Sequence, residues 1–160
     1  MSDRRKPPLT WRIVDALIRA ECPEVASIST DRLAAWLDDD PRPLLLDART
    51  SDEYAVSHLP SAVRVDPEAS PEVLADEVAT LRGSDSERPI VVYCSVGIRS
   101  ARVADRLRHA GIGAVYNLDG SIFRWASEGR PVVRDGEPVR AVHPYNAVWG
   151  RLLPRDLHPD

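Results

Sequence analysis

The residues that could do chemistry gather where an apolar run, Pro89–Tyr93, ends in the cysteine Cys94. The run is rich in Ile and Val, so it is predicted to be a buried strand with Cys94 at its carboxyl end. A loop leading from such a strand into a helix presents backbone N–H groups to an anion. Together with a cation such as Arg99, these groups lower the pKa of a cysteine thiol from about 8.5 to roughly 3.5–7.5.

We therefore expect Cys94 to act as a thiolate nucleophile towards soft electrophiles, above all sulfur bound to sulfur. The product would be a persulfide whose charged terminal sulfur accepts hydrogen bonds from the loop. This chemistry needs no metal and no organic cofactor. The plainer interpretation is that Cys94 is a small core residue, but a structural cysteine would not need the glycine, arginine and serine that follow it. The predicted substrate-binding residues are Ser95, Val96, Gly97, Ile98, Arg99 and Ser100.

Strands alternate with helices around this loop. Strand patterns cover residues 26–29, 43–48, 62–65, 89–93 and 114–118, and helix patterns cover 10–21, 30–37, 70–81 and 100–110, with shorter helices after 50 and after 119. Such alternation predicts an α/β fold with a mainly parallel sheet and helices on both faces. Ligands of these sheets bind beyond the carboxyl ends of the strands, where Cys94 is placed.

Two charged residues, Asp47 and Arg49, end the second strand pattern near the expected position of the Cys94 loop. We interpret them as loop support through hydrogen bonds, the alternative being a local ion pair. Glu53 is explained by a capping box with Thr50, in which side chains and backbone N–H groups at a helix start satisfy one another.

Four residues elsewhere have weaker claims to a role. His58 precedes Leu-Pro at a turn and is interpreted as a hydrogen-bonded turn residue rather than a general acid. Trp125 lies at helical spacing from an isoleucine and is predicted to be core. Phe123 and Arg124 would then face the rim of the pocket and touch an acceptor.

The composition fits one globular core of 160 residues. The net charge of −4 gives no general basic field for nucleic acid.

The two cysteines, Cys22 and Cys94, are not in a CxxC pair, which argues against zinc and favours free thiols in a reducing compartment. The charged start and interrupted first helix resemble neither a signal peptide nor a membrane span, so we predict a cytoplasmic protein.

The chain is divided here into a tail with an amphipathic helix over 1–26, a central domain over 27–134 and an extension over 135–160. The tail proper is residues 1–8. In the first helix Ile13, Val14, Leu17 and Ile18 are expected to line one face. The extension carries Trp149, Leu152 and Leu153, and it is expected to pack within the chain rather than on a second copy or a partner.

Three ordered stretches resemble the signatures of single-domain rhodanese-like sulfurtransferases. They are residues 44–62, residues 91–101 around Cys94, and residues 117–132. The resemblance implies a five-stranded rhodanese fold and transfer of a sulfane sulfur, with Cys94 as nucleophile and the loop Ser95–Arg99 as anion cradle. It implies a small anionic donor such as thiosulfate and an acceptor such as cyanide, a thiol or a sulfur-carrier protein. The loop interior, however, lacks the extra positive charge that family members favouring thiosulfate often carry.

Two other functions use similar parts. Cysteine phosphatases and arsenate reductases also place a cysteine and an arginine around a loop, but with five residues between them, whereas four separate Cys94 from Arg99. The tighter ring suits a single sulfur better than a tetrahedral oxyanion. A catalytically silent binding module is the third alternative, and the intact Cys94 and Arg99 argue against it.

Overall fold

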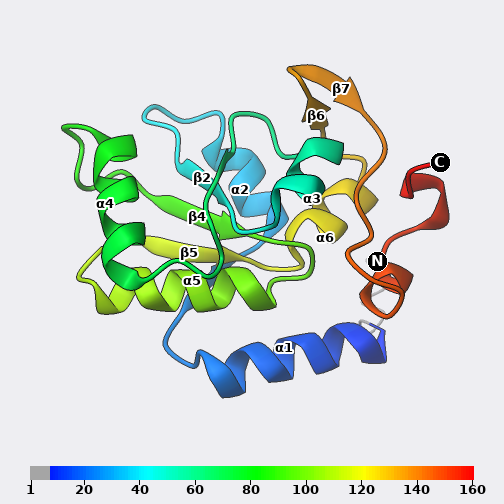
Figure 1. Ribbon diagram of the computed structural model, residues 1–160, viewed down its shortest axis with the longest axis horizontal. Helices are drawn as coiled ribbons and strands as arrows, with labels where there is room; N and C mark the ends of the chain where they lie inside the picture. The colour runs from blue at the N-terminus through cyan, green and yellow to red at the C-terminus, as the bar shows by residue number, and fades with distance from the viewer. Residues whose placement is uncertain (1–7) are drawn as a thin grey trace, which may run out of the picture.

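The computed structural model describes residues 8–160 and places five parallel strands in one sheet of order β1-β5-β4-β2-β3 (Figure 1). The predicted tail over residues 1–8 lies, up to residue 7, outside the described residues. The strands of this sheet are β1 (Ala26–Ile28), β2 (Leu44–Asp47), β3 (Val63–Arg64), β4 (Ile90–Tyr93) and β5 (Val115–Leu118). The helices are α1 (Leu9–Glu21), α2 (Thr30–Trp36), α3 (Ser51–Val56), α4 (Pro71–Arg82), α5 (Ile98–His109) and α6 (Ser121–Ser127).

Helices cover both faces of the sheet because both faces of its central strands are apolar. Successive side chains of a strand point to opposite faces. Accordingly Val91 of β4 belongs to the apolar cluster that holds Leu33 of α2 and Ile122 of α6, and Val92 belongs to a second cluster with Leu74 of α4 and Val103 of α5. The predicted α/β architecture, a parallel sheet between two helical layers, is confirmed.

The sheet register places the ends of two neighbouring strands side by side. In the β2–β4 ladder Leu46 lies opposite Val92 and Asp47 lies opposite Tyr93. Cys94 follows Tyr93 directly, so the thiol and the Asp47 carboxylate belong to the same edge of the sheet. Helix α5 begins at Ile98, two residues before the predicted start, because Gly97 turns the chain with a φ of 114°.

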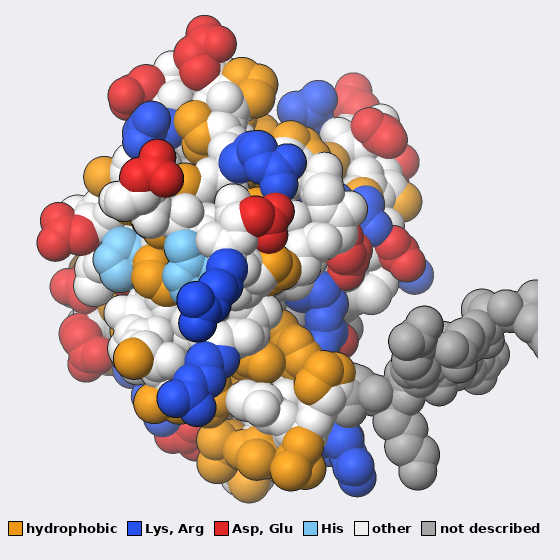
Figure 2. Space-filling model, turned by 90° about the vertical axis from the view of Figure 1, so that its right-hand side faces the viewer, with side chains coloured by type: hydrophobic (Ala, Val, Ile, Leu, Met, Phe, Trp, Pro, Cys, Tyr) orange, Lys and Arg blue, Asp and Glu red, His pale blue; other side chains and the backbone are white. Residues whose placement is uncertain are grey.

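Helix α1 packs outside the sheet against α5. Its packed side consists of Trp11, Val14 and Ile18, at helical spacing. Ile13 and Leu17, which the sequence placed on the same face, are instead roughly half exposed, so that expectation was wrong for these two residues. Figure 2 shows hydrophobic side chains gathered on the lower part of this side of the molecule, towards the amino-terminal end of α1.

The chain after α6 forms an antiparallel hairpin of β6 (Val132–Arg134) and β7 (Glu137–Val139), which the sequence reading missed. The predicted domain boundary after residue 134 falls in its Asp-Gly turn, where both residues have positive φ. Two short 3-10 helices follow, η1 (Trp149–Leu152) and η2 (Arg155–Leu157). The side chains of Val142, Leu153 and Leu157 are buried in the main apolar cluster, so the extension packs within the chain, as expected.

Among residues 8–160 no helix is both long and apolar enough to cross a membrane.

Candidate active site

Cys94 lies at the carboxyl end of β4, at the edge of a pocket. Its backbone N–H donates to Ser121 Oγ at 3.2 Å, and its Sγ accepts a hydrogen bond from the Gly97 N–H at 3.1 Å. The residue is only 1% exposed, yet it lines a pocket of about 240 Å³. The sulfur is therefore shielded from bulk solvent but borders a space that a small ligand can fill. The lining residues are Cys94, Ser95, Val96, Ile98, Arg99, Arg102, Tyr145 and Trp149.

Gly97 gives the loop its turn. A φ of 114° is strained for any residue with a Cβ, and a Cβ here would lie 3.3 Å from Ile18 Cδ1 of α1. Within residues 8–160 the loop N–H groups other than that of Gly97 donate no hydrogen bond; these are the groups of Ser95, Val96, Ile98, Arg99 and Ser100. Three of them belong to the first turn of α5, whose amino-terminal dipole favours negative charge. The loop therefore combines a thiol with unused donors suited to an anion.

Ser100 approaches the sulfur from α5. Its Oγ lies 3.4 Å from Cys94 Sγ and 2.6 Å from Asn117 Oδ1 of β5. A hydroxyl carries one hydrogen, so it can donate to only one of these two acceptors at a time. The Asn117 side chain also donates to the Gly97 carbonyl at 3.0 Å. Asn117 thus holds both Gly97 and Ser100, and sequence reasoning missed it because nothing in the β5 pattern marks an asparagine as pointing to the loop.

Glu53 and Arg99 form a partly buried ion pair that braces the loop. The Arg99 guanidinium donates to both carboxylate oxygens of Glu53 at 2.9 and 2.8 Å, and to Ser95 Oγ at 2.9 Å. The same carboxylate completes the predicted capping box with Thr50, which is confirmed. Burial alone would raise the pKa of Glu53, but the hydrogen bonds from Arg99 and Thr50 outweigh it and lower that pKa to about 2.

The pairing adds a contact that the sequence did not predict for Arg99. The sequence suggested a cation that lowers the pKa of the Cys94 thiol, and in the structure this guanidinium borders the pocket and is also paired with the Glu53 carboxylate. Glu53 was explained completely by helix capping, so its second set of bonds went unnoticed. Burial lowers the pKa of Arg99, but the hydrogen bonds to Glu53 and the nearby Cys94 together raise it by more. The net shift is upward, so Arg99 stays charged.

Asp47 and Arg49 form a second ion pair, at the carboxyl end of β2. Arg49 donates to Asp47 through Nε at 2.9 Å and Nη2 at 2.7 Å, and to the Ser57 carbonyl at 2.7 Å. The Tyr93 hydroxyl donates to Asp47 Oδ2 at 2.6 Å. In the described chain neither residue bonds to the loop after Cys94, so the direct hydrogen bonds expected between them and that loop are not formed. Their link to it passes through Tyr93, the residue before Cys94.

The remaining candidates lie away from the pocket. Trp125 is buried, as predicted, and its Nε1 donates to the Pro131 carbonyl at 2.8 Å. Phe123 is fully buried in the main apolar cluster, so its placement at the pocket rim was wrong. Arg124 turns instead to Asp119 and to the face of Trp11. His58 stacks on Tyr54, and its Nδ1 lies 2.9 Å from the Leu59 carbonyl oxygen.

The cysteines and the possible metal ligands also bear on the sequence predictions. Cys22 and Cys94 are both buried and free. Burial raises the pKa of Cys22, with Asp105 and Glu21 adding to the effect. Residues 8–160 contain no group of three or more His, Cys, Asp or Glu side chains that could hold a metal ion.

Comparison with known proteins finds one family over most of the chain. The family model described as a rhodanese-like domain matches residues 29–128. The tRNA uridine(34) hydroxylase of Sodalis glossinidius is 32% identical over 124 residues, which are 78% of this chain and 34% of that protein. The chain thus spans about a third of the length of this relative.

Two solved structures share the fold. A thiosulfate sulfurtransferase from Pseudomonas aeruginosa matches 88% of this chain and 26% of its own, with a TM-score of 0.62 and 24% identity. A Rhodopseudomonas palustris protein of unknown function, described as a possible tyrosine phosphatase, matches 75% of this chain and 93% of its own, with a TM-score of 0.62 and 19% identity.

Proposed function

Since the chain belongs to the rhodanese-like family, we propose that it is a sulfurtransferase that carries a sulfane sulfur on Cys94. The observation that supports this best is the surroundings of Sγ. One loop amide already bonds the sulfur, and neighbouring amides at the start of α5 have no other acceptor within residues 8–160. A persulfide anion would take up these donors through charge-assisted hydrogen bonds.

The proposed reaction has two steps. The Cys94 thiolate attacks the outer sulfur of a donor R–S–S⁻, for which thiosulfate is the simplest inorganic counterpart. A bond forms between Sγ and that sulfur, the donor S–S bond breaks, and the leaving group keeps the electron pair. In the second step an acceptor such as cyanide or a thiolate attacks the outer sulfur, and Cys94 leaves as a thiolate. No metal or organic cofactor takes part.

Two activities that appear in the descriptions of similar proteins fit this site less well. A phosphatase would seat a tetrahedral phosphate, but the loop between Cys94 and Arg99 has four residues and its arginine is bound to Glu53. The hydroxylation named for the bacterial relatives belongs to proteins of which this chain matches about a third. The loop's own chemistry is sulfur transfer, and we propose a thiol or a sulfur-carrier protein in the cytoplasm as its acceptor.

Intact-mass spectrometry after treatment with thiosulfate or inorganic polysulfide tests the proposal. We expect the protein to gain one sulfur atom, and cyanide to remove it as thiocyanate. The two cysteines provide matched variants: Cys94→Ser should gain nothing, whereas Cys22→Ser should behave like the unmodified chain. If no donor adds sulfur, the domain is a binding module; if an aryl phosphate is hydrolysed through Cys94, it is a phosphatase.

A further inference from the structure

One wall of the pocket beside Cys94 comes from the extension after the hairpin. Tyr145 and Trp149 both line that pocket, although they follow Cys94 by about fifty residues and lie outside the 29–128 range of the family match. The Tyr145 ring stacks on the Arg99 guanidinium at 4.2 Å from its centroid. Trp149 packs against the main apolar cluster. The pocket is therefore finished by aromatic side chains that the shared domain does not supply.

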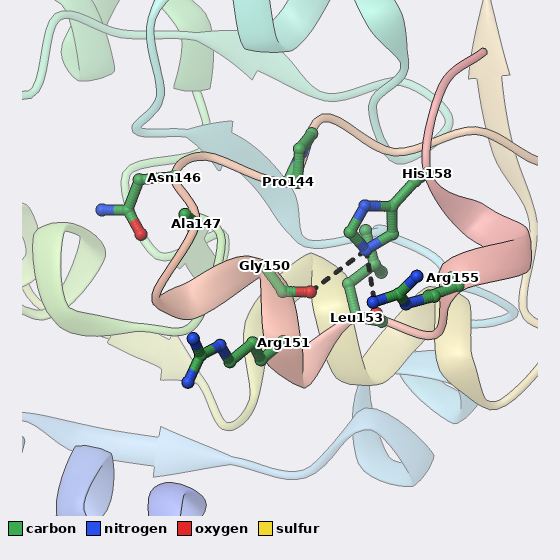
Figure 3. Close-up of a pocket in the computed structure, with 8 residues that line it drawn as sticks. All are labelled: Pro144, Asn146, Ala147, Gly150, Arg151, Leu153, Arg155 and His158. Atoms are coloured by element: carbon green, nitrogen blue, oxygen red, sulfur yellow. Dashed lines mark hydrogen bonds between the residues drawn. The ribbon is translucent and has the colours of Figure 1, made fainter.

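This wall is held in place by its own contacts. Asn146 Oδ1 accepts the N–H groups of Val148 and Trp149 at 3.0 and 2.9 Å and so starts η1. Figure 3 shows a second pocket formed by the same segment, where the His158 ring lies near the carbonyls of Gly150 and Leu153; its Nε2 is 3.1 and 3.0 Å from their oxygens.

Close packing fixes the same turn. A Cβ on Gly150 would come within 3.1 Å of Pro144 Cβ and 3.2 Å of its carbonyl oxygen, so the chain folds tightly on itself here. Below it, Leu153 and Leu157 are buried in the main apolar cluster. The aromatic pair is thus presented on an anchored segment, which lowers the ordering cost of binding a ligand.

The charges around the pocket are balanced. Arg99 is paired with Glu53, and Arg102 donates through Nε to Glu21 at 2.9 Å. Each guanidinium that borders the pocket is therefore matched by a carboxylate. A doubly charged inorganic donor gains little from such a balanced rim, because attraction and repulsion nearly cancel.

Apart from Cys94, Ser95 and the two arginines, the residues that line the pocket are apolar or aromatic. Val96 and Ile98 of the loop face the pocket together with Tyr145 and Trp149. Aromatic side chains bind flat apolar groups well, by area burial and by ring contacts worth about 0.5–1.5 kcal/mol. The pocket volume of about 240 Å³ leaves room for more than one sulfur atom beside Cys94.

We infer that Tyr145 and Trp149 make this site selective for organic thiols and persulfides of low molecular weight whose R group is apolar or aromatic. The inference rests on the proposed sulfurtransferase function and adds its substrate class. The R group would lie against the aromatic wall while its sulfur meets Cys94. For an acceptor thiolate, R–S⁻ attacks the outer sulfur of Cys94–S–S⁻; the product is R–S–S⁻, and Cys94 returns to a thiolate.

Discharge of the loaded protein provides the test. Cys94 is first loaded with inorganic polysulfide, and loss of the added sulfur is then timed by intact mass with phenylmethanethiol, 2-mercaptoethanol or cyanide. We expect Trp149→Ala and Tyr145→Ala each to slow discharge by phenylmethanethiol about 3- to 10-fold. Discharge by cyanide should not change, because cyanide is too small to reach the wall, and discharge by 2-mercaptoethanol should change little.

Val148→Ala is the matched control. Val148 neighbours Trp149 on the same segment but is 63% exposed and does not line the pocket, so all three rates should stay as in the unmodified chain. Tyr145 is 41% exposed, so Tyr145→Ala is less disruptive to packing than Trp149→Ala and keeps the test valid if the Trp149 variant fails to fold. Equal slowing of all three acceptors, or no slowing at all, would overturn the inference while leaving sulfur transfer intact. Failure of the unmodified chain to load sulfur would instead refute the proposed function, and the inference with it.

Discussion

Two carboxylate–arginine pairs lie near the edge of the sheet where β2 and β4 end, and they differ in what surrounds them. The Asp47–Arg49 pair is sealed, with both side chains 0% exposed. The Glu53–Arg99 pair has a carboxylate that is 2% exposed and a guanidinium that is 16% exposed and borders the pocket. Both are bidentate, and both engage a hydroxyl, Tyr93 in one and Ser95 in the other.

The comparison shows that an ion pair at the ligand edge of a sheet does not by itself make a site. Asp47 connects β2 to β4 through the Tyr93 hydroxyl, and Arg49 connects it to the Ser57 carbonyl after α3. All of these hydrogen bonds lie within the core. Glu53 and Arg99 brace a loop whose amides remain available within the described chain. The first pair fixes the strand that carries Cys94, and the second shapes the loop that receives its ligand.

Removing the arginine of the sealed pair should have the largest effect. Arg49→Met leaves the Asp47 carboxylate buried without its cation, which typically costs about 3–5 kcal/mol. Urea unfolding should show this loss, while sulfur loading per folded molecule stays close to that of the unmodified chain. Arg108→Ala is the control, because its pair with Glu24 is exposed and should contribute less than about 1 kcal/mol. Similar losses in the two variants would break the distinction between sealed and surface pairs.

The pocket-side pair should make stability depend on acid pH. The folded pKa of Glu53, about 2, lies below its ordinary value of 4.5, so the unfolded chain takes up this proton first. The stabilisation, about 3 kcal/mol at 1.36 kcal/mol per pKa unit, is complete above about pH 4.5 and is lost as pH falls towards 2. Unfolding free energies of the unmodified chain and Glu53→Gln should therefore converge over this window. Parallel curves would contradict the assignment.

Gly97 tests the turn that aims an amide at the sulfur. Gly97→Ala would place a Cβ at positive φ, where non-glycine residues cost roughly 1–2 kcal/mol. We expect lower stability together with slower loading of Cys94, since the Gly97 N–H bond to Sγ would shift. Gly136, in the hairpin turn far from Cys94 in sequence, also has positive φ, and a Cβ added there would meet nothing within 4 Å. Gly136→Ala should reduce stability alone; loading slowed equally in both would rule out a specific role for Gly97.

Ser100 should give the smallest effect of these. Ser100→Ala removes a hydroxyl that donates one hydrogen bond, either to Cys94 Sγ or to Asn117, worth about 0.5–1.5 kcal/mol. Persulfide loading should slow by about 3- to 10-fold. Ser127→Ala, which removes a hydroxyl bonded within α6, should leave loading unchanged. If the Ser100 variant loads at the normal rate, the hydroxyl only supports Asn117 and does not act on the sulfur.

Much of the fold was predictable from local pattern. The apolar runs of β2 and β4 are short and continuous because both faces of these strands are buried, and the alternation of strands with helices then indicated a parallel sheet. The β6–β7 hairpin has a sequence signal that the prediction did not use, an Asp135–Gly136 turn pair between two short segments that carry valines. The buried face of α1 was predicted only in part. Ile13 and Val14 are adjacent, and periodicity alone does not decide which of them points to the core.

The candidate site was predictable only where its residues are contiguous. Cys94, Gly97 and Arg99 lie within six consecutive residues, so their spacing in the sequence was enough to predict a thiolate site. Glu53, Asn117 and Tyr145 come from separate elements, and only tertiary packing brings them to that loop. Glu53 shows the difficulty most clearly, because one carboxylate serves a cap and an ion pair, and the cap alone satisfied the sequence pattern.

Sulfur transfer by this chain requires that the pocket at the end of β4 hold a second sulfur on Cys94. Peptide mapping by mass spectrometry after polysulfide treatment, with a thiol-capping reagent added to preserve persulfides, locates the added sulfur. We predict one added sulfur on the peptide that contains Cys94 and none on the peptide that contains Cys22. Sulfur on Cys22 alone, or on neither cysteine, would contradict it.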